Sequence, residues 1–465
     1  MRRPTRARIL GAQCAVTWAA CLALFATALT DTAAAAPLDN PGALTRITAA
    51  ADLAKFQLKE NRVPESSLNN LAAEMGTAVG VDTVLKSANH TMRNRSGCVP
   101  DERMALPLDP AATDAYCWDT GDATTQSWLP QSVTTSGDAD DDGSWGANKV
   151  ILSGWTHNDS KAGDPEADKH LARVAFIDAN NPAQFKYRWV LLVIPINGGT
   201  NYKKLESHLG GMVWYQDKLI VTARNGAADN NAMYIFDMSR ILQANVNSTA
   251  IGKVSGGWSA RGYQYVMPAI GSYSLTAGAC NSSVGTSVPC FGSVSLDRTS
   301  TPDSLVATEF HSSGGTEAGR VWRYYFSTAA DRPGLIGING SGVANVDEVY
   351  RTKVVGMQGV LSHKPGGAST ANWYVPESTW GPKVHGALWR QNLQGAMAAA
   401  NCGQPKKYSC WGQHTQALSY WQSTGKVWSL TEWAANPDAK WEDPVVPERV
   451  LFATPLSSID AALDN

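Results

Sequence analysis

The sequence predicts an all-β fold: a β-propeller, most simply of five four-stranded blades, with a short α-helical N-terminal segment. Short apolar runs recur from about residue 117 onward, in sets of three or four. Each set begins with a run rich in small residues, and these runs start at residues 131, 210, 291, 358 and 416. Four antiparallel strands repeated in this way are typical of a propeller, because each sheet needs a neighbour to bury its faces. A β-sandwich is the alternative, but it does not explain the four-strand period.

The composition excludes two classes of protein. Of the 465 residues, 43% are apolar and 17% are charged, and 39 basic residues nearly balance 41 acidic ones. A nucleic-acid-binding protein would carry a basic excess. A disordered chain would combine low hydrophobicity with a high net charge, whereas the net charge here is −2. We therefore expect a folded protein that does not bind nucleic acid.

Residues 1–36 have the pattern of a secretory signal peptide. Four arginines lie among the first eight residues, residues 9–29 are largely apolar, and alanines 34–36 offer a cleavage site before Pro37. A membrane anchor is the alternative, but Gln13 interrupts the apolar stretch and no stop-transfer block of charges follows it. We expect a secreted, extracellular protein without a membrane span.

The cysteines agree with export. Six remain after the signal peptide, and an even number in a secreted chain indicates disulfides. Since they fall into three pairs of near neighbours, we expect each pair to close one loop: Cys98–Cys117, Cys280–Cys290 and Cys402–Cys410. A metal site is the alternative, but no C-x-x-C spacing supports it.

Residues 37–100 are predicted to form a helical N-terminal segment ahead of a propeller at 101–465. Leu68, Leu71 and Met75 recur at helical spacing after Ser66, which can cap a helix. A second helix is expected at about 52–60. A cleaved pro-segment is the alternative interpretation.

Each predicted blade is built from successive strands. The first strands are expected at 131–133, 210–213, 291–294, 358–361 and 416–419, and the second strands at 150–155, 219–224, 305–309, 373–377 and 427–432. The third strands are expected at 172–178, 232–238, 319–326, 386–390 and 449–454, and four of the fourth strands at 187–195, 263–270, 349–355 and 406–410. No fourth strand follows residue 454, so a segment between Met104 and Trp118 is expected to complete the last blade.

Several of these stretches resemble blades of secreted actinobacterial β-propeller proteins of unassigned activity. The resemblance lies in residues 208–221, 233–241, 295–305 and 418–432, and it spans about 130–455. It implies a secreted propeller but no particular activity. The dispase autolysis-inducing protein, an extracellular propeller, is similar in kind. No functional residue is carried over from it, because the two are not matched residue by residue.

The repeat predicts a site at one mouth of the propeller channel. In an antiparallel blade, the first strand begins on the face where the second strand ends, so polar residues at these places converge. We expect Glu309, Glu377, Glu432 and His208 to be the catalytic candidates, because clustered carboxylates suit general acid and base chemistry. The substrate-binding candidates are Arg224, Gln131, Gln358, Gln416, Trp155 and Trp433. The alternative is that these groups cap strand ends and bind water.

One motif predicts a metal. The run Asp138-Ala-Asp140-Asp-Asp142-Gly143 matches the D-x-D-x-D-G pattern of calcium loops, so Asp138, Asp140 and Asp142 are candidate ligands of a structural calcium ion. The EF-hand ending is absent, because Lys149 stands where the bidentate glutamate would be. A solvated acidic turn is the alternative. No nucleotide or redox cofactor is expected.

Two functions follow from these features. The first is binding or processing of an extracellular polymer, foremost a polysaccharide, at the channel mouth. If the protein is an enzyme, it would be a glycan lyase or a glycoside hydrolase. The second is a non-catalytic propeller that engages a secreted protein or the cell wall. We expect a monomer in either case.

Overall fold

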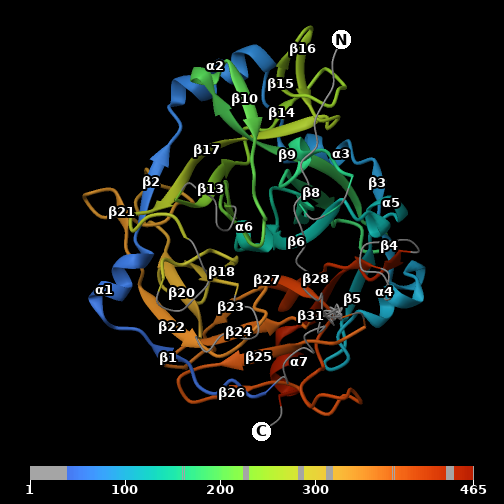
Figure 1. Cartoon of the computed structure of the whole chain (residues 1–465), viewed down its shortest axis with the longest axis vertical. Coiled ribbons are helices and arrows are strands. Elements are labelled where there is room, and N and C mark those ends of the chain that lie inside the picture. Colours follow the sequence, from blue (N-terminus) through green and yellow to red (C-terminus); the bar gives the residue numbers. More distant parts are fainter. Residues whose placement is uncertain are drawn as a thin grey trace, which may run out of the picture. The chain divides into compact units, whose positions relative to one another are not determined.

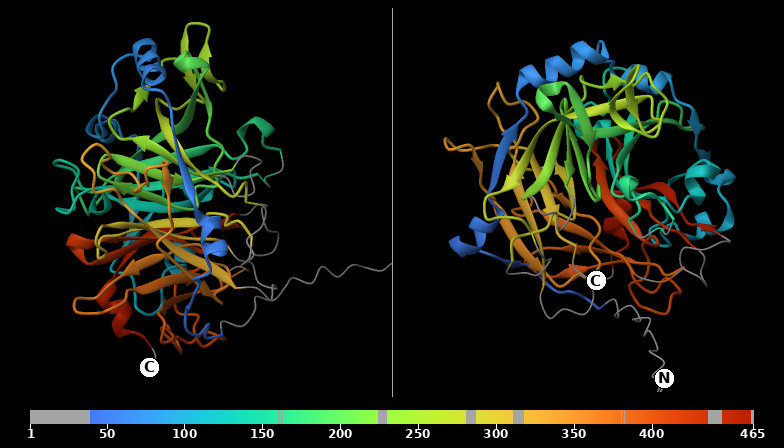
Figure 2. Two further views of the ribbon diagram at one scale, coloured as in Figure 1. Left: turned by 90° about the vertical axis from the view of Figure 1, so that its left-hand side faces the viewer. Right: turned by 45° about the horizontal axis from the view of Figure 1, so that its top comes forward.

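The structure is a computed structural model that describes residues 39–159, 161, 163–223, 230–280, 287–310, 318–379, 381, 383–435 and 445–463. The chain is mostly β, with 42% of residues in strands and 14% in helices. The described residues belong to one compact unit, Ala35–Asn465, whose strands are shown in Figures 1 and 2. The prediction of a mostly β chain is confirmed, and the predicted signal peptide lies outside the described residues.

Five sets of four antiparallel strands form the body of this unit, and we number the sets as units 1 to 5 (Figure 1). Unit 1 is β6 (Trp128–Thr135), β7 (Val150–His157), β8 (Ala172–Asp178) and β9 (Lys186–Ile196). Unit 2 is β11 (Met212–Tyr215), β12 (Lys218–Thr222), β13 (Asn231–Asp237) and β17 (Tyr265–Leu275). Unit 3 is β18 (Ser293–Asp297), β19 (Ser304–Thr308), β20 (Gly319–Tyr325) and β22 (Glu348–Thr352). Unit 4 is β23 (Leu361–His363), β24 (Asn372–Glu377), β25 (Ala387–Gln391) and β26 (Ala396–Met397), and unit 5 is β27 (Thr415–Trp421), β28 (Lys426–Thr431), β31 (Val450–Pro455) and β5 (Asp114–Cys117).

The fourth strands of the last two units differ in how well the sequence predicted them. In unit 5, β5 pairs with β31 through Asp114↔Ala453, so the prediction that a segment between Met104 and Trp118 completes this sheet is confirmed. In unit 4, the prediction of a strand at 406–410 is wrong. The fourth strand is the short β26, which pairs with the end of β25, because the disulfide Cys402–Cys410 holds the later segment in a loop.

Residues 37–100 are only partly helical and add edge strands to the units. β1 (Thr45–Arg46) pairs with β22, β2 (Leu58–Arg62) with β17, β3 (His90–Thr91) with β9 and β4 (Arg93–Asn94) with β5. The predicted helix at 52–60 is wrong in its second half, which is strand β2. The other predicted helix is α2 (Glu65–Met75); it buries Leu68 and Leu71 and ends at Gly76, whose φ of 98° favours glycine.

The remaining strands and α-helices do not belong to the five four-stranded sets. The other strands are β10 (Asn201–Lys204), β14 (Leu242–Gln243), β15 (Ile251–Val254), β16 (Gly257–Ala260), β21 (Val343–Ala344), β29 (Ala434–Ala435) and β30 (Val446–Pro447). The other helices are α1 (Ala50–Leu53), α3 (Val81–Lys86), α4 (Pro100–Met104), α5 (Thr120–Thr124), α6 (Ser136–Ala139) and α7 (Leu456–Ala461). Units 1 and 2 are joined into one sheet by the parallel pairing of β9 with β17. None of the helices in the described part of the chain is long and apolar enough to cross a membrane.

The first strands of the five units lie next to one another. β6 contacts β11, β11 contacts β18, β18 contacts β23, β23 contacts β27, and β27 contacts β6. Five apolar clusters fill the spaces between consecutive units, such as the cluster that packs Val133 and Trp155 of unit 1 against Trp428 and Leu451 of unit 5. Each sheet is therefore covered on both faces by its neighbours.

Glycines permit the closest of these approaches. A Cβ atom on Gly211, just before β11, would lie 2.0 Å from the main-chain nitrogen of Val294 in β18. One on Gly359, just before β23, would lie 2.9 Å from the carbonyl oxygen of Gln416 in β27. The predicted first strands thus begin with small residues because a larger side chain there would clash with the neighbouring strand.

The three predicted disulfides are confirmed. Cys98–Cys117, Cys280–Cys290 and Cys402–Cys410 have Cα–Cα distances of 5.6, 5.2 and 5.5 Å. Each closes a loop of fewer than 20 residues.

The approach at Gly211 yields a stability prediction. Gly211→Ala should lower the free energy of unfolding by about 1–3 kcal/mol or more, because the new methyl group meets main-chain atoms that cannot rotate away. Thermal unfolding followed by circular dichroism measures the effect. The control is Gly340→Ala, where a Cβ atom meets nothing within 4 Å. Equal melting temperatures for the two variants would contradict this account of the strand packing.

Candidate functional site

Two hollows lie at opposite ends of the unit strands. The first, which we call the Glu432 cavity, is at the end where first strands begin and second strands end. Its volume is about 20 Å³. It brings together four of the predicted site residues, and its lining is Phe310, Gly356, Gln358, Ser378, Thr379, His414, Gln416, Glu432 and Trp433.

Glu432 is held by two glutamine side chains. The amide Nε2 of Gln131 donates to Glu432 Oε1 at 2.7 Å, and Nε2 of Gln416 donates to Oε2 at 3.0 Å. Gln131 comes from unit 1, whereas Gln416 and Glu432 belong to unit 5. Burial raises the pKa of Glu432 to about 7, although the hydrogen bond from Gln131 and the charge of Arg449 oppose the shift.

The wall of the cavity is an aromatic pair. The rings of His414 and Trp433 stack with centroids 3.7 Å apart and planes at 1°. Burial lowers the pKa of His414 to about 3, so its imidazole is neutral at physiological pH. Trp433, a predicted substrate-binding residue, is therefore in contact with the cavity.

The other two predicted catalytic glutamates do not line this cavity. The Glu309 carboxylate accepts two hydrogen bonds of 2.7 Å from Arg320, and both side chains are at most 1% exposed. Glu377 Oε2 accepts a bond of 2.6 Å from the indole of Trp389, and burial raises the pKa of Glu377 to about 7. Both carboxylates are committed to partners inside the protein.

The structure separates the remaining predicted residues from the Glu432 cavity. His208 is not among the lining residues; burial lowers its pKa, with a smaller contribution from His170 that Asp159 opposes. Trp155 is fully buried, with its ring 4.9 Å from that of Trp118. Arg224 lies outside the described residues.

The predicted calcium ligands do not converge. The buried Asp138 carboxylate accepts hydrogen bonds from Thr134 and Ser419, at 2.6 and 2.7 Å. Asp140 and Asp142 instead accept bonds from main-chain N–H groups of their own turn. In the described ranges, two groups bring at least three candidate ligand atoms within 4.8 Å of one another, and neither contains these aspartates.

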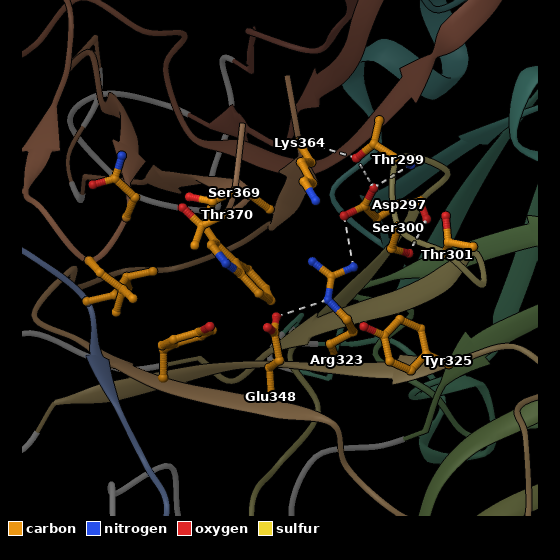
Figure 3. Close-up of a pocket in the computed structure, with 16 residues that line it drawn as sticks. Asp297, Thr299, Ser300, Thr301, Arg323, Tyr325, Glu348, Lys364, Ser369 and Thr370 are labelled. Carbon is orange, nitrogen blue, oxygen red and sulfur yellow. Dashed lines mark hydrogen bonds and ion pairs between the residues drawn. The ribbon is translucent and has the colours of Figure 1, made fainter. Parts of the chain in front are cut away.

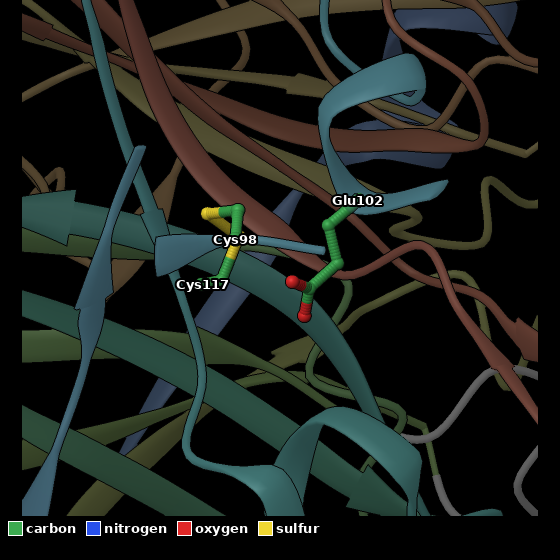
Figure 4. Close-up of side chains that lie close together, drawn as sticks. All are labelled: Cys98, Glu102 and Cys117. Atoms are coloured by element: carbon green, nitrogen blue, oxygen red, sulfur yellow. A yellow bond between two sulfur atoms is a disulfide. The ribbon is translucent and has the colours of Figure 1, made fainter. Parts of the chain in front are cut away.

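Those two groups already have other roles. In the first, Cys98 and Cys117 form a disulfide beside Glu102, as Figure 4 shows, so no thiolate is available. In the second, which also contains His90 and Asp119, the Asp122 carboxylate accepts bonds from Arg173 and Tyr187 at 2.9 and 2.6 Å. We interpret both groups as structural.

The second hollow is much larger and lies between units 3 and 4, near the β18–β19 and β23–β24 loops. We call it the Arg323 pocket; its volume is about 290 Å³. Figure 3 shows its labelled side chains facing one another across the hollow. The polar lining residues are Asp297, Thr299, Ser300, Thr301, Arg323, Tyr325, Glu348, Lys364, Ser369, Thr370 and Asn392, and Leu44, Tyr350, Ala371, Trp373 and Leu393 complete the wall.

An ion-pair network holds the base of this pocket rigid. Arg323 donates to Asp297 Oδ2 at 2.8 Å and to Glu348 Oε2 at 3.2 Å (Figure 3). Its NH2 group also donates to the Ser362 hydroxyl at 2.6 Å. Burial alone would lower the pKa of Arg323, but the two carboxylates outweigh burial and raise it. The guanidinium is thus a fixed cation.

Sequence reasoning missed the Arg323 pocket because it followed only one end of the strands. A usable signal was present in residues 297–303, where aspartates, hydroxyl residues and a proline are concentrated in one turn. The contacts with Glu348 and Lys364 had no local signal, since they come from later strands and loops. Comparisons with protein-family models and with curated proteins found no match to this chain.

The buried ion pair yields a prediction about Glu309. Glu309→Gln should lower the free energy of unfolding by about 3–5 kcal/mol, because it leaves the Arg320 guanidinium buried and uncompensated. Chemical denaturation measures the loss. The double variant Glu309→Leu/Arg320→Met should recover most of it, since no buried charge remains. A stable Glu309→Gln protein would instead favour a functional role for this carboxylate.

A second prediction concerns pH. Burial, reinforced by Asp101, raises the pKa of Glu448 to about 7 from an ordinary value of 4.5. The folded protein therefore keeps a proton that the unfolded chain loses, so this group's stabilising effect falls as pH rises from about 4.5 to 7. Glu448→Gln should remove that fall and raise stability at pH 8 by about 1–3 kcal/mol, with little change near pH 4. Melting curves across this range test it, with exposed Glu166→Gln as the control; parallel curves for Glu448→Gln and wild type would contradict it.

Proposed function

We propose that this chain is a secreted five-bladed β-propeller that binds a neutral extracellular polysaccharide in the Arg323 pocket. Three observations support the propeller: the five four-stranded units, the contacts that join their first strands end to end, and the apolar clusters between consecutive units. The disulfides support secretion, because disulfides persist in oxidising compartments. The resemblance to secreted actinobacterial propellers is compatible with both.

The lining of the Arg323 pocket is the observation that carries the glycan assignment. Ligand pockets usually have volumes of about 300 Å³ or more, and the Glu432 cavity is too small for a sugar ring by that measure. The Arg323 pocket approaches it, and hydroxyl groups of Thr299, Ser369 and Thr370 surround its entrance. Hydroxyl, carboxylate and ammonium groups fixed on a rigid base match the donors and acceptors of a sugar.

A third hollow lies beside the Arg323 pocket, along unit 4. It has a volume of about 520 Å³ and shares Asn392 with the Arg323 pocket. Its other lining residues include Arg390, Lys407 and Tyr408. Two hollows that meet at one residue offer contacts to more than one sugar, which suits a polymer better than a free monosaccharide.

The charges favour a neutral ligand and a binding role. Two carboxylates, Asp297 and Glu348, face two cations, Arg323 and Lys364, so the pocket carries no net formal charge. Asp297 is 1% exposed and accepts bonds from Arg323 and from the Thr299 main chain. Because both carboxylates are engaged by Arg323, the pocket offers no free acid and base for bond cleavage.

The proposal predicts a binding defect without a stability defect. The migration of the mature protein is measured in native gels that each contain one neutral polysaccharide of a panel. Migration should be slower in gels with a polysaccharide that the protein binds, and calorimetry should show that this binding is saturable. Lys364→Ala combined with Ser369→Ala/Thr370→Ala should weaken that binding by about tenfold or more, because these exposed side chains face the pocket and support no packing.

The control is Ser341→Ala, an exposed serine that does not line the pocket. Binding unaffected by the triple variant, or the absence of binding across the panel, would contradict the proposal. New reducing ends, or unsaturated uronate absorbance, after incubation with a glycan would show an enzyme rather than a binding protein.

A further inference from the structure

The Glu432 cavity has a feature that the polysaccharide proposal does not use: a buried carboxylate that forms no salt bridge with any of the described residues. The Glu432 carboxylate is bonded to the neutral amides of Gln131 and Gln416. Within the described residues, no lysine, arginine or histidine nitrogen lies within 4.0 Å of it. Buried charges in proteins are normally paired, or coordinate a metal.

The charge of Arg449 acts on the Glu432 carboxyl, but the hydrogen bonds of this guanidinium go to main-chain oxygens. Its Nε donates to the main-chain oxygen of Glu432 at 2.6 Å. Its NH1 group donates to the main-chain oxygens of Asp122 and Thr125, at 3.0 and 2.6 Å. The guanidinium thus donates to three carbonyl groups, and within the described residues the Glu432 carboxylate has no salt-bridge partner.

The two glutamines carry a second, independent signal. Each side chain is 1% exposed, and each amide donates one N–H hydrogen bond to the Glu432 carboxylate. The Oε1 atoms of both side chains are buried without a hydrogen-bond partner. Leaving a buried acceptor unpaired is destabilising, so the Gln416 oxygen, which belongs to the cavity lining, indicates a missing positive or donating group beside the carboxylate.

The size of the cavity restricts what that group can be. A volume of about 20 Å³ holds one small species, since a single water needs about 10–15 Å³ by the same measure. A sugar ring or an amino-acid side chain is excluded. The lining adds a third amide, Gln358, to the acceptors.

We propose that the Glu432 cavity is a binding site for a single hard metal cation, held by the Glu432 carboxylate and the side-chain carbonyl oxygen of Gln416, with the Gln358 side chain also in its lining. Carboxylate and amide oxygens are the ligands that Ca²⁺ prefers, and its flexible geometry tolerates ligands from separate strands. Gln131 of unit 1, whose amide donates to Glu432, would then orient the carboxylate from the neighbouring unit. A water molecule would satisfy the same oxygens but would supply no positive charge.

Terbium luminescence and calorimetry on the mature protein test this site. Tb³⁺ occupies calcium sites and is sensitised by a nearby indole, and Trp433 lines the same cavity. We expect Trp-excited Tb³⁺ emission that Ca²⁺ displaces. Trp433→Phe should reduce the emission, because it removes the indole that lines the cavity.

The decisive variant is Glu432→Gln, which should weaken Ca²⁺ binding by about tenfold or more. Its matched control is Glu377→Gln, a buried glutamate at the corresponding strand end of unit 4 that does not line the cavity. Gln416→Met, which removes a carbonyl ligand while keeping the side-chain length, provides a second test should Glu432→Gln fail to fold. Asp140→Asn/Asp142→Asn should leave the binding intact.

Two outcomes would overturn the proposal. One is the absence of Ca²⁺ and Tb³⁺ binding at millimolar concentrations by folded wild-type protein. The other is binding that survives both Glu432→Gln and Gln416→Met, or that is lost in Asp140→Asn/Asp142→Asn, which would assign the cation to the acidic turn. Polysaccharide binding in the Arg323 pocket is measured separately, so neither outcome bears on it.

Discussion

The close approach of the first strands is the constraint on which the other features of the molecule depend. Main-chain atoms of Val294 lie where a side chain on Gly211 would be, and the carbonyl oxygen of Gln416 would lie 2.9 Å from a Cβ atom on Gly359. Only glycine, which has no Cβ atom, can occupy positions so close to a neighbouring strand. They bring five strands from sequence-distant segments into mutual contact, and they leave little space at the centre for anything but small polar groups.

This crowding explains why carboxylates at similar strand ends have different environments. At the end of β19, Glu309 is neutralised by Arg320 from the neighbouring strand. At the end of β24, Glu377 faces the indole of Trp389. After β28, Glu432 meets glutamines from two different units. Since each carboxylate has lost water, each must find a local partner, and the partner available depends on which way its side chain turns.

The sequence predicted the strands better than it predicted the directions in which their side chains point. The first three strands of every unit, and β5 as the last strand of unit 5, follow from apolar runs and small residues, because both signals are local. Orientation depends on register, and a shift of one residue turns a side chain to the opposite face. The positions of Glu309 and Trp155 in the repeat predicted that both lie at a channel mouth. Glu309 instead forms an ion pair with Arg320, and Trp155 packs on Trp118. Gln131, Gln416 and Glu432 do converge, because they belong to adjoining first strands and the strand beside them.

The same constraint separates the two hollows. Where first strands begin, the main chains are so close that the Glu432 cavity admits one small species. At the opposite strand ends, the β18–β19 and β23–β24 connections diverge, and a pocket of about 290 Å³ opens between units 3 and 4. Arg323 keeps that pocket from collapsing, because its guanidinium holds Asp297 on β18 and Glu348 on β22 in fixed positions. A ligand larger than an ion therefore has space only on the loop side, where the strands no longer pack against one another.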